Sequence, residues 1–226
     1  MSEFVAELKE VFQREADPEN AEKMAAYMRN LFPFYGVNSP RQKEIQRAFL
    51  KAKGLPSVDV AADLIKELWN EPPRELQYFA MRMADRYVKK TDAGFIEVYQ
   101  WMVVNKSWWD TVDFIAAHLV GTHFKRFPGL IPEYTGRWMD SQNIWLQRTA
   151  LLFQLKYKEN TDTALLFHFI EKLADDEEFF IRKAIGWALR EYSKTNPDAV
   201  LRFTSTHRLS PLSKTEALRL IKRKKL

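Results

Sequence analysis

Apolar side chains recur along the chain with the three- to four-residue spacing of amphipathic helices, and no segment alternates with the two-residue period of a strand. This pattern breaks at short polar or proline-containing stretches such as Asp17-Pro18, Ser39-Pro40 and Asn196-Pro197, which are typical of helix starts. No glycine- or serine-rich linker divides the helices. We therefore expect an all-α protein with one domain over residues 1–226.

Three of the expected helices align with one another without gaps. They are ELQYFAMRMADRY (75–87), WLQRTALLFQLKY (145–157) and FIRKAIGWALREY (180–192), and their closing tyrosines are 70 and 35 residues apart. A period of about 35 with paired helices is typical of HEAT or armadillo repeats, which stack into a curved α-solenoid. The sequence therefore predicts a solenoid of about six helical pairs with a concave face.

The composition excludes several classes of site. Cysteine is absent, which rules out disulfides, thiolate metal sites and a cysteine nucleophile, and a reducing compartment suits such a chain. The N-terminal segment MSEFVAELKE has no signal-peptide core, and no apolar run approaches the roughly 20 residues of a membrane helix. We expect a soluble, cytoplasmic protein without a membrane partner.

The charge balance points weakly to a polyanionic partner. The chain carries 35 Lys+Arg against 30 Asp+Glu, a net charge of +5, and its pI is about 9.2. It ends in the basic run Lys222, Arg223, Lys224 and Lys225. Two interpretations of this run stay open: a solvated helix end that favours cations through the helix dipole, or a contact with DNA.

One face of the helix at 180–192 combines cations with a large aromatic ring. On a helical wheel, Lys183, Trp187, Arg190 and Lys194 lie opposite the apolar stripe that contains Ile185. An exposed tryptophan on a polar stripe invites a partner. We therefore expect these cations to form part of a basic DNA-binding face.

The repeat frame extends this face to other helices. Lys183 is equivalent to Arg148 and, one period earlier, to Asp113, while Trp109 lies one turn before Asp113 on the same side. Together with Trp187, these side chains offer cations for phosphates, flat rings for a sugar or base, and one carboxylate. The sequence thus predicts a DNA-directed site around Asp113.

Each of these residues also has a structural interpretation. A carboxylate repels phosphates, so Asp113 is tolerated on a DNA-binding surface only if it has a function there. The structural alternative is that Asp113 pairs with Arg148 or a neighbouring lysine. Trp109 and Trp187 can serve in packing between repeats. The remaining tryptophans, apart from Trp108, lack charged companions and are expected to be structural: Trp69, Trp101, Trp138 and Trp145.

No sequence motif indicates a metal or a nucleotide. The histidines His118, His123, His168 and His207 lack metal-ligand spacing, so we expect no metal site. His118 falls on the core stripe of its repeat and is expected to be buried. No GxSxG, P-loop or GxGxxG motif occurs, so hydrolases of those types, NTPases and dinucleotide enzymes have no support.

Three strings resemble the AlkD family of DNA alkylation repair enzymes. They are KSWWDTVD (106–113), NIWLQR (143–148) and FFIRKAIGWALREYSKTNP (179–197), and the similarity runs from about Phe4 to Lys222. The resemblance implies a curved stack of HEAT-like helical pairs. It also implies a glycosylase that removes cationic alkylated purines from duplex DNA, as a monomer and without a cofactor.

The resemblance also implies roles for individual residues. Asp113 matches the catalytic aspartate of the family, and Trp109 and Trp187 match the two aromatics that cradle the deoxyribose of the damaged nucleotide. Arg148 matches an arginine near the phosphates that flank the lesion, and Tyr27 matches a third aromatic of the cleft. Two other functions stay open: a HEAT-like protein that binds branched or damaged DNA without catalysis, and a solenoid scaffold for another protein.

Overall fold

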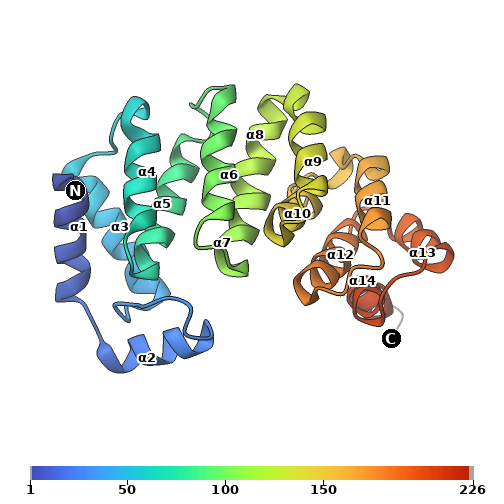
Figure 1. Cartoon of the computed structure of the whole chain (residues 1–226), viewed down its shortest axis with the longest axis horizontal. Coiled ribbons are helices and arrows are strands. Elements are labelled where there is room, and N and C mark those ends of the chain that lie inside the picture. The colour runs from blue at the N-terminus through green and yellow to red at the C-terminus, as the bar shows by residue number, and fades with distance from the viewer. Residues whose placement is uncertain (1, 224–226) are drawn as a thin grey trace. The chain divides into compact units, whose positions relative to one another are not determined.

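The computed structural model describes residues 2–223, and every regular element among them is helical (Figure 1). Internal contacts divide the chain into two compact units, residues 1–98 and 99–226. The single domain expected over residues 1–226 stays a prediction. The first unit contains α1 (Glu3–Arg14), α2 (Pro18–Tyr27), α3 (Ser39–Lys53), η1 (Val58–Val60), α4 (Ala61–Asn70), α5 (Arg74–Tyr87), η2 (Ala93–Phe95) and the start of α6 (Ile96–Val104).

The second unit continues α6 and carries the segments that resemble the AlkD family. A single long helix begins at Trp109 and consists of three parts, of which the middle one is π-helical. The elements are α7 (Trp109–Phe114), η3 (Ile115–Val120), α8 (Gly121–Arg126), η4 (Pro128–Leu130), α9 (Ile131–Asp140), α10 (Ile144–Leu152), η5 (Lys158–Asn160), α11 (Thr163–Lys172), α12 (Phe179–Tyr192), α13 (Pro197–Thr206) and α14 (Pro211–Arg223).

Polar side chains begin several helices at the breaks expected from sequence. Asp17 accepts a hydrogen bond from the N–H of Asn20 at 3.1 Å, and Asn196 accepts one from Ala199 at 3.0 Å. Each cap satisfies one of the backbone N–H groups that the first turn of a helix leaves without a partner. The prediction of an all-α chain with these boundaries is confirmed.

The repeat found in the sequence has a structural counterpart at the start of each aligned helix. Gln77 on α5 donates to the carbonyl of Trp69 at 3.1 Å, and Gln147, 70 residues on, donates to Met139 at 3.3 Å. The equivalent residue on α12, Arg182, donates to the carbonyl of Asp176 at 2.7 Å. In each case a side chain at the same repeat position binds the backbone of the segment before its own helix: the last turn of α4, the last turn of α9, and the loop after α11. How the pairs stack into a solenoid stays a prediction.

The core of each unit is built from the apolar faces of these helices. Trp69 is 0% exposed in the first unit, and Trp138 is 1% exposed in the second. Trp145 packs against Trp108 with ring centroids 5.7 Å apart. The expectation of a structural role is therefore confirmed for these tryptophans, which supply much of the apolar area removed from water.

Helix α14 packs tightly on α12 at a glycine. A Cβ atom at Gly186 would lie 2.5 Å from Cβ of Glu216 and 2.9 Å from the carbonyl oxygen of Ser213. The hydroxyl of Ser213 also donates to the carbonyl of Arg182 at 2.9 Å. Only the absence of a side chain at position 186 permits this approach, because even an alanine methyl would meet α14 backbone.

Candidate functional site

The carboxylate of Asp113, near the end of α7, is held at both oxygens by Arg148 of α10. Nε of Arg148 donates to Oδ1 at 2.7 Å, and Nη2 donates to Oδ2 at 2.9 Å. The third guanidinium nitrogen, Nη1, donates to the backbone carbonyl of Phe180 at the start of α12. This two-pronged geometry is the strongest form of a carboxylate–arginine pair and fixes the direction of the carboxylate.

The pair lies at the edge of the packed interior. The side chain of Arg148 is 5% exposed and that of Asp113 is 17% exposed, so Asp113 is the member of the pair that is partly open to solvent. An aromatic cluster lies behind the pair: the ring of Phe180 is 5.0 Å from Trp108 and 5.0 Å from Trp145. The Phe180 ring is also 5.9 Å from Cζ of Arg148, so this cluster packs against the buried arginine of the pair.

Burial and the arginine act in opposite directions on Asp113. Burial raises the pKa of the Asp113 carboxyl above its ordinary value of 3.8, and this effect outweighs the lowering caused by Arg148. Asp110, one turn away on the same helix, contributes a small further increase of the pKa of Asp113. Asp113 is thus a partly desolvated carboxylate that depends on Arg148 to stay ionised.

The position of Arg148 corrects the surface inferred from the helical wheel. The wheel placed Arg148 on an exposed face, and the structure buries it, so that expectation is wrong. The ion pair between Asp113 and Arg148, which the sequence left open as an alternative, is confirmed. A helical wheel shows only the side of its own helix on which a side chain lies. It does not show that a second helix, here α7 with Asp113, packs a charged partner against that side.

The two tryptophans of the predicted site lie in the same unit as Asp113. Trp109 is the first residue of α7, one turn before Asp113, so its ring and the carboxylate are neighbours on one helix face. Trp187 lies in the middle of α12. Both indoles are partly exposed, unlike the fully buried Trp69 and Trp138.

The lysine and the arginine on α12 are not a free basic stripe. Nζ of Lys183 lies 2.9 Å from Oε1 of Glu216, and Nη1 of Arg190 binds the other oxygen of the same carboxylate. Arg219 lies 3.8 Å from Glu216 as well. Lys183 and Arg190 were expected on an exposed basic face, and α14 covers part of that face because Gly186 allows it to approach α12 closely. Their contact with DNA stays a prediction.

Glu216 is the residue of this region that the sequence did not single out. Its carboxylate is shared by three cations, which lower the pKa of Glu216 below its ordinary value of 4.5, the hydrogen bond from Lys183 having the largest effect. Because one carboxylate serves three cations, the group retains a net positive charge. The sequence analysis did not single out Glu216, because α14 is not one of the three helices whose sequences align.

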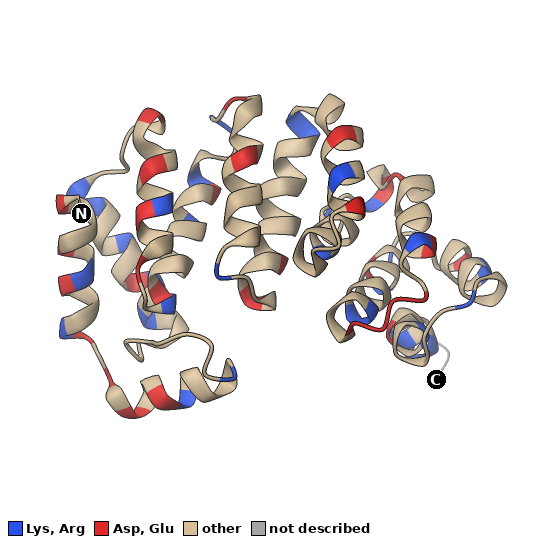
Figure 2. Cartoon of the chain, in the orientation of Figure 1, with Lys and Arg blue, Asp and Glu red and all other residues tan. Residues whose placement is uncertain are grey.

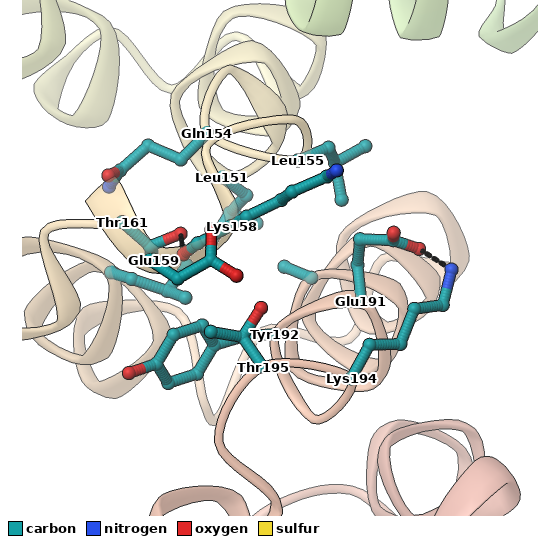
Figure 3. Close-up of a pocket in the computed structure, with 12 residues that line it drawn as sticks. Leu151, Gln154, Leu155, Lys158, Glu159, Thr161, Glu191, Tyr192, Lys194 and Thr195 are labelled. Atoms are coloured by element: carbon teal, nitrogen blue, oxygen red, sulfur yellow. Dashed lines mark hydrogen bonds and ion pairs between the residues drawn. The ribbon is translucent and has the colours of Figure 1, made fainter.

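Lys194 lies at the rim of a small pocket (Figure 3). Its Nζ is 2.6 Å from a carboxylate oxygen of Glu191, and the side chain is 55% exposed. The pocket has a volume of about 200 Å³ and is lined by residues of α10, η5 and α12 with the turns beside them, including Tyr192. That volume is below the roughly 300–1,000 Å³ typical of small-molecule sites.

The other described residues with a predicted DNA contact lie at the ends of helices. Tyr27 ends α2 in the first unit and is 71% exposed. Of the basic C-terminal run, Lys222 and Arg223 end α14, while Lys224 and Lys225 lie outside the described residues. Figure 2 shows acidic and basic positions interleaved on α1, α4 and α9, and the concave basic face stays a prediction.

His118 differs from its expected position. It was placed in the core, and the structure leaves it partly exposed, with its ring stacked on Phe114 at 4.3 Å and 3°. The neighbouring Ala117 is buried in its place. The cause is the π-helical segment η3, which adds residues per turn and shifts the register of the repeat after Asp113.

Two further searches of the described residues bear on partners. No helix within residues 2–223 is long and apolar enough to cross a membrane. In the same range, no group of three or more His, Asp or Glu side chains is placed to hold a metal ion.

Comparisons with known proteins agree with the motifs around Asp113. The family model described as DNA alkylation repair enzyme matches residues 8–221. A solved structure described as a predicted DNA alkylation repair enzyme from Enterococcus faecalis is similar, with a TM-score of 0.84 and 33% sequence identity over 90% of this chain and 95% of that chain. No curated protein sequence matches the chain. Because the family model spans both units, the chain belongs to the AlkD-type family of DNA alkylation repair enzymes.

Proposed function

We propose that the protein hydrolyses the N-glycosidic bond of cationic alkylated purines, such as 3-methyladenine and 7-methylguanine, in duplex DNA. The observation that carries the proposal is the Asp113 carboxylate, which is fixed by Arg148 at both oxygens and still partly open to solvent. Family membership supports a DNA substrate. The reaction uses water, and neither a metal nor an organic cofactor takes part in it.

The chemistry follows from the charge of the lesion. When the bond between C1′ and N9 breaks, its electron pair moves to the base and neutralises the positive charge there, so no acid is needed to protonate the leaving group. Positive charge develops on the sugar as an oxocarbenium ion. A fixed carboxylate beside C1′ stabilises that charge, and Asp113 has the required sign and rigidity.

Water completes the reaction. Its oxygen adds to C1′, and the proton it loses is accepted by Asp113 or by bulk solvent, which leaves a hemiacetal at the abasic site. Because Arg148 donates to both carboxylate oxygens, Asp113 acts mainly through its charge in this proposal. Its partial exposure leaves an approach for the substrate.

The indole rings of Trp109 and Trp187 are assigned to the sugar. A cation over an indole face gains about 0.5–2 kcal/mol, so each ring adds to the stabilisation supplied by the carboxylate. Trp109 adjoins Asp113 on α7, which places a ring and a negative charge on one surface. Selectivity then comes from the charge and lability of the lesion, without a fitted pocket for a flipped base.

Phosphate contacts are proposed for the remaining predicted residues. Lys183 and Arg190 share Glu216 with Arg219, so this cluster keeps net positive charge for a phosphodiester. Lys194 and Tyr27 complete the proposed set. For Arg148, we propose that the guanidinium leaves Asp113 and binds a phosphate when DNA is bound. We further propose that the protein acts as a monomer.

One observation favours the non-catalytic alternative, in which the protein binds branched or damaged DNA. Both oxygens of Asp113 already accept from Arg148, and a carboxylate saturated in this way can serve structure alone. Base release separates the two functions. The purified protein is incubated with one duplex that carries 7-methylguanine and a matched duplex that carries uracil, an uncharged leaving group.

The proposal predicts free 7-methylguanine and alkali-labile abasic sites in the first duplex only. Binding of the methylated duplex without release of the base contradicts the glycosylase and supports the alternative. Equal release from both duplexes contradicts the assignment of selectivity to lesion charge.

A further inference from the structure

A second polar pair is formed by His118 and Lys156. His118 lies on the same long helix as Asp113, five residues further along the chain. Nζ of Lys156 is 3.3 Å from Nδ1 of His118, and the imidazole is stacked face to face on Phe114 with centroids 4.3 Å apart. Lys156 is exposed and lies in the turn that follows α10. The pair thus joins the same two helical segments as Asp113 and Arg148.

The backbone explains why this turn reaches the helix. A Cβ atom at Gly121 would lie 2.4 Å from the carbonyl oxygen of Phe153, so the turn and the helix are in backbone contact. The hydroxyl of Tyr157 donates to the carbonyl of Gly121 at 2.7 Å and fixes the next residue after Lys156. The π-helical segment η3 turns His118 out of the core and toward this turn.

The pairing of Lys156 differs from that of three other lysines in the same unit. Lys172, Lys183 and Lys194 each lie against a carboxylate. Within residues 2–223, no carboxylate lies within ion-pair distance of Lys156, and its ammonium meets an imidazole nitrogen instead. An ammonium only donates hydrogen bonds, so Nδ1 of His118 is the acceptor in this contact.

We infer that His118 and Lys156 form a binding site for a phosphodiester of duplex DNA, one helical turn beyond the proposed reaction centre. The ammonium of Lys156 supplies the charge, and the imidazole of His118, stacked on Phe114, fixes the position of the ammonium. The inference rests on the proposed function for the identity of the anion. It adds two residues to the DNA contact that neither the sequence motifs nor the repeat frame had indicated.

The test measures affinity for an unmodified duplex by fluorescence anisotropy across a salt series. Each phosphate contact made by a cation contributes about 0.9 to the slope of log affinity against log salt concentration. K156Q is expected to reduce the slope by about that amount, which makes the fall in affinity between about 50 and 200 mM salt roughly threefold smaller. H118Q is expected to weaken binding about two- to fivefold with the slope unchanged, because a neutral imidazole releases no counterion.

K172Q is the matched control, since it removes one exposed lysine charge from α11. It is expected to leave the slope as in the unaltered protein. A slope for K156Q equal to that of K172Q overturns the inference. Binding of inorganic phosphate below 1 mM, seen as a shift of the His118 imidazole resonances that K156Q abolishes, assigns the site to a free anion and overturns the assignment to duplex DNA.

The outcomes for the proposed function are separate. Loss of slope in K156Q together with no base release by the unaltered protein leaves the phosphodiester site standing and removes the glycosylase. Base release by the unaltered protein, together with an unchanged slope in K156Q, supports the glycosylase and overturns the phosphodiester site.

Discussion

Arg148 and Asp113 are 35 residues apart, and the guanidinium of the first donates to both carboxylate oxygens of the second at 2.7 and 2.9 Å. Their separation equals the period of the helical repeat, so equivalent positions of successive repeats carry opposite charges that meet. The pair also connects to α12 through the carbonyl of Phe180. One arginine therefore ties together the three segments that carry the family motifs.

The pH dependence of base release is expected to report the Asp113 carboxyl. Burial raises the pKa of this carboxyl above its ordinary value of 3.8, so the active carboxylate is lost at a higher pH than for an exposed aspartate. The rate of 7-methylguanine release in saturating DNA, corrected for release without protein, is expected to fall as the pH decreases, with a midpoint above 3.8. A rate that is constant down to pH 3.8 contradicts a catalytic role for the carboxylate.

Arg148→Ala is expected to lower both stability and activity. It leaves a partly buried carboxylate without its partner, which costs about 2–4 kcal/mol in the free energy of unfolding. It also removes the effect that lowers the pKa of Asp113, so the acid limb of the rate moves to higher pH. Urea unfolding and the pH profile measure the two effects.

Arg148→Lys is the control for charge without the two-pronged geometry. Its free energy of unfolding and the pH at which its rate falls are expected to lie between those of the unaltered protein and Arg148→Ala. The salt dependence of DNA binding by Arg148→Ala tests the proposed phosphate contact of Arg148. A slope reduced by about 0.9 supports that contact, and an unchanged slope limits Arg148 to the positioning of Asp113.

Gly186→Ala is expected to destabilise the protein by about 1–3 kcal/mol. The added methyl would lie 2.9 Å from the Ser213 carbonyl and 2.5 Å from Glu216 Cβ, so α14 has to move away from α12. Gly136→Ala is the matched control, because Gly136 lies within α9 and nothing is within 4 Å of its added methyl. Alanine there is expected to stabilise by about 0.5–1 kcal/mol. Equal changes in the urea midpoints of the two variants contradict the close packing of α14.

Glu216→Gln is expected to reduce stability in a pH-dependent way. The cations around Glu216 lower its pKa in the folded protein below 4.5, so its contribution is present above that pH and is lost as the pH falls through the folded pKa. The difference in free energy of unfolding from the unaltered protein is expected to be about 1 kcal/mol at pH 7 and to vanish at low pH. A difference that grows on acidification has the wrong sign for this network.

The sequence predicts the helices and the relation between Asp113 and Arg148 well, and for one physical reason. Both depend on periodicity: the three- to four-residue period gives the apolar faces, and the 35-residue period makes residues 113 and 148 equivalent. Periodicity shows that two side chains share a face. It does not show whether they bind each other or a ligand, and here the two bind each other.

The failures lie where a neighbouring helix or a local irregularity decides the environment of a side chain. Lys183 and Arg190 were expected on an exposed basic face because a wheel of α12 alone does not include α14, which packs on that face. His118 was expected in the core because a uniform helix was assumed through η3, and the π-helical turn shifts the register after Asp113. Contacts from a neighbouring helix and insertions within a helix leave no trace in the apolar pattern of a single helix.

The most direct measurement of the central claim is single-turnover release of 7-methylguanine by Asp113→Asn in saturating duplex DNA, with DNA affinity measured in parallel. Asparagine keeps the shape of the side chain and removes its charge, so the account predicts loss of release with affinity nearly unchanged. Release by Asp113→Asn at the rate of the unaltered protein would contradict the role of this carboxylate in catalysis.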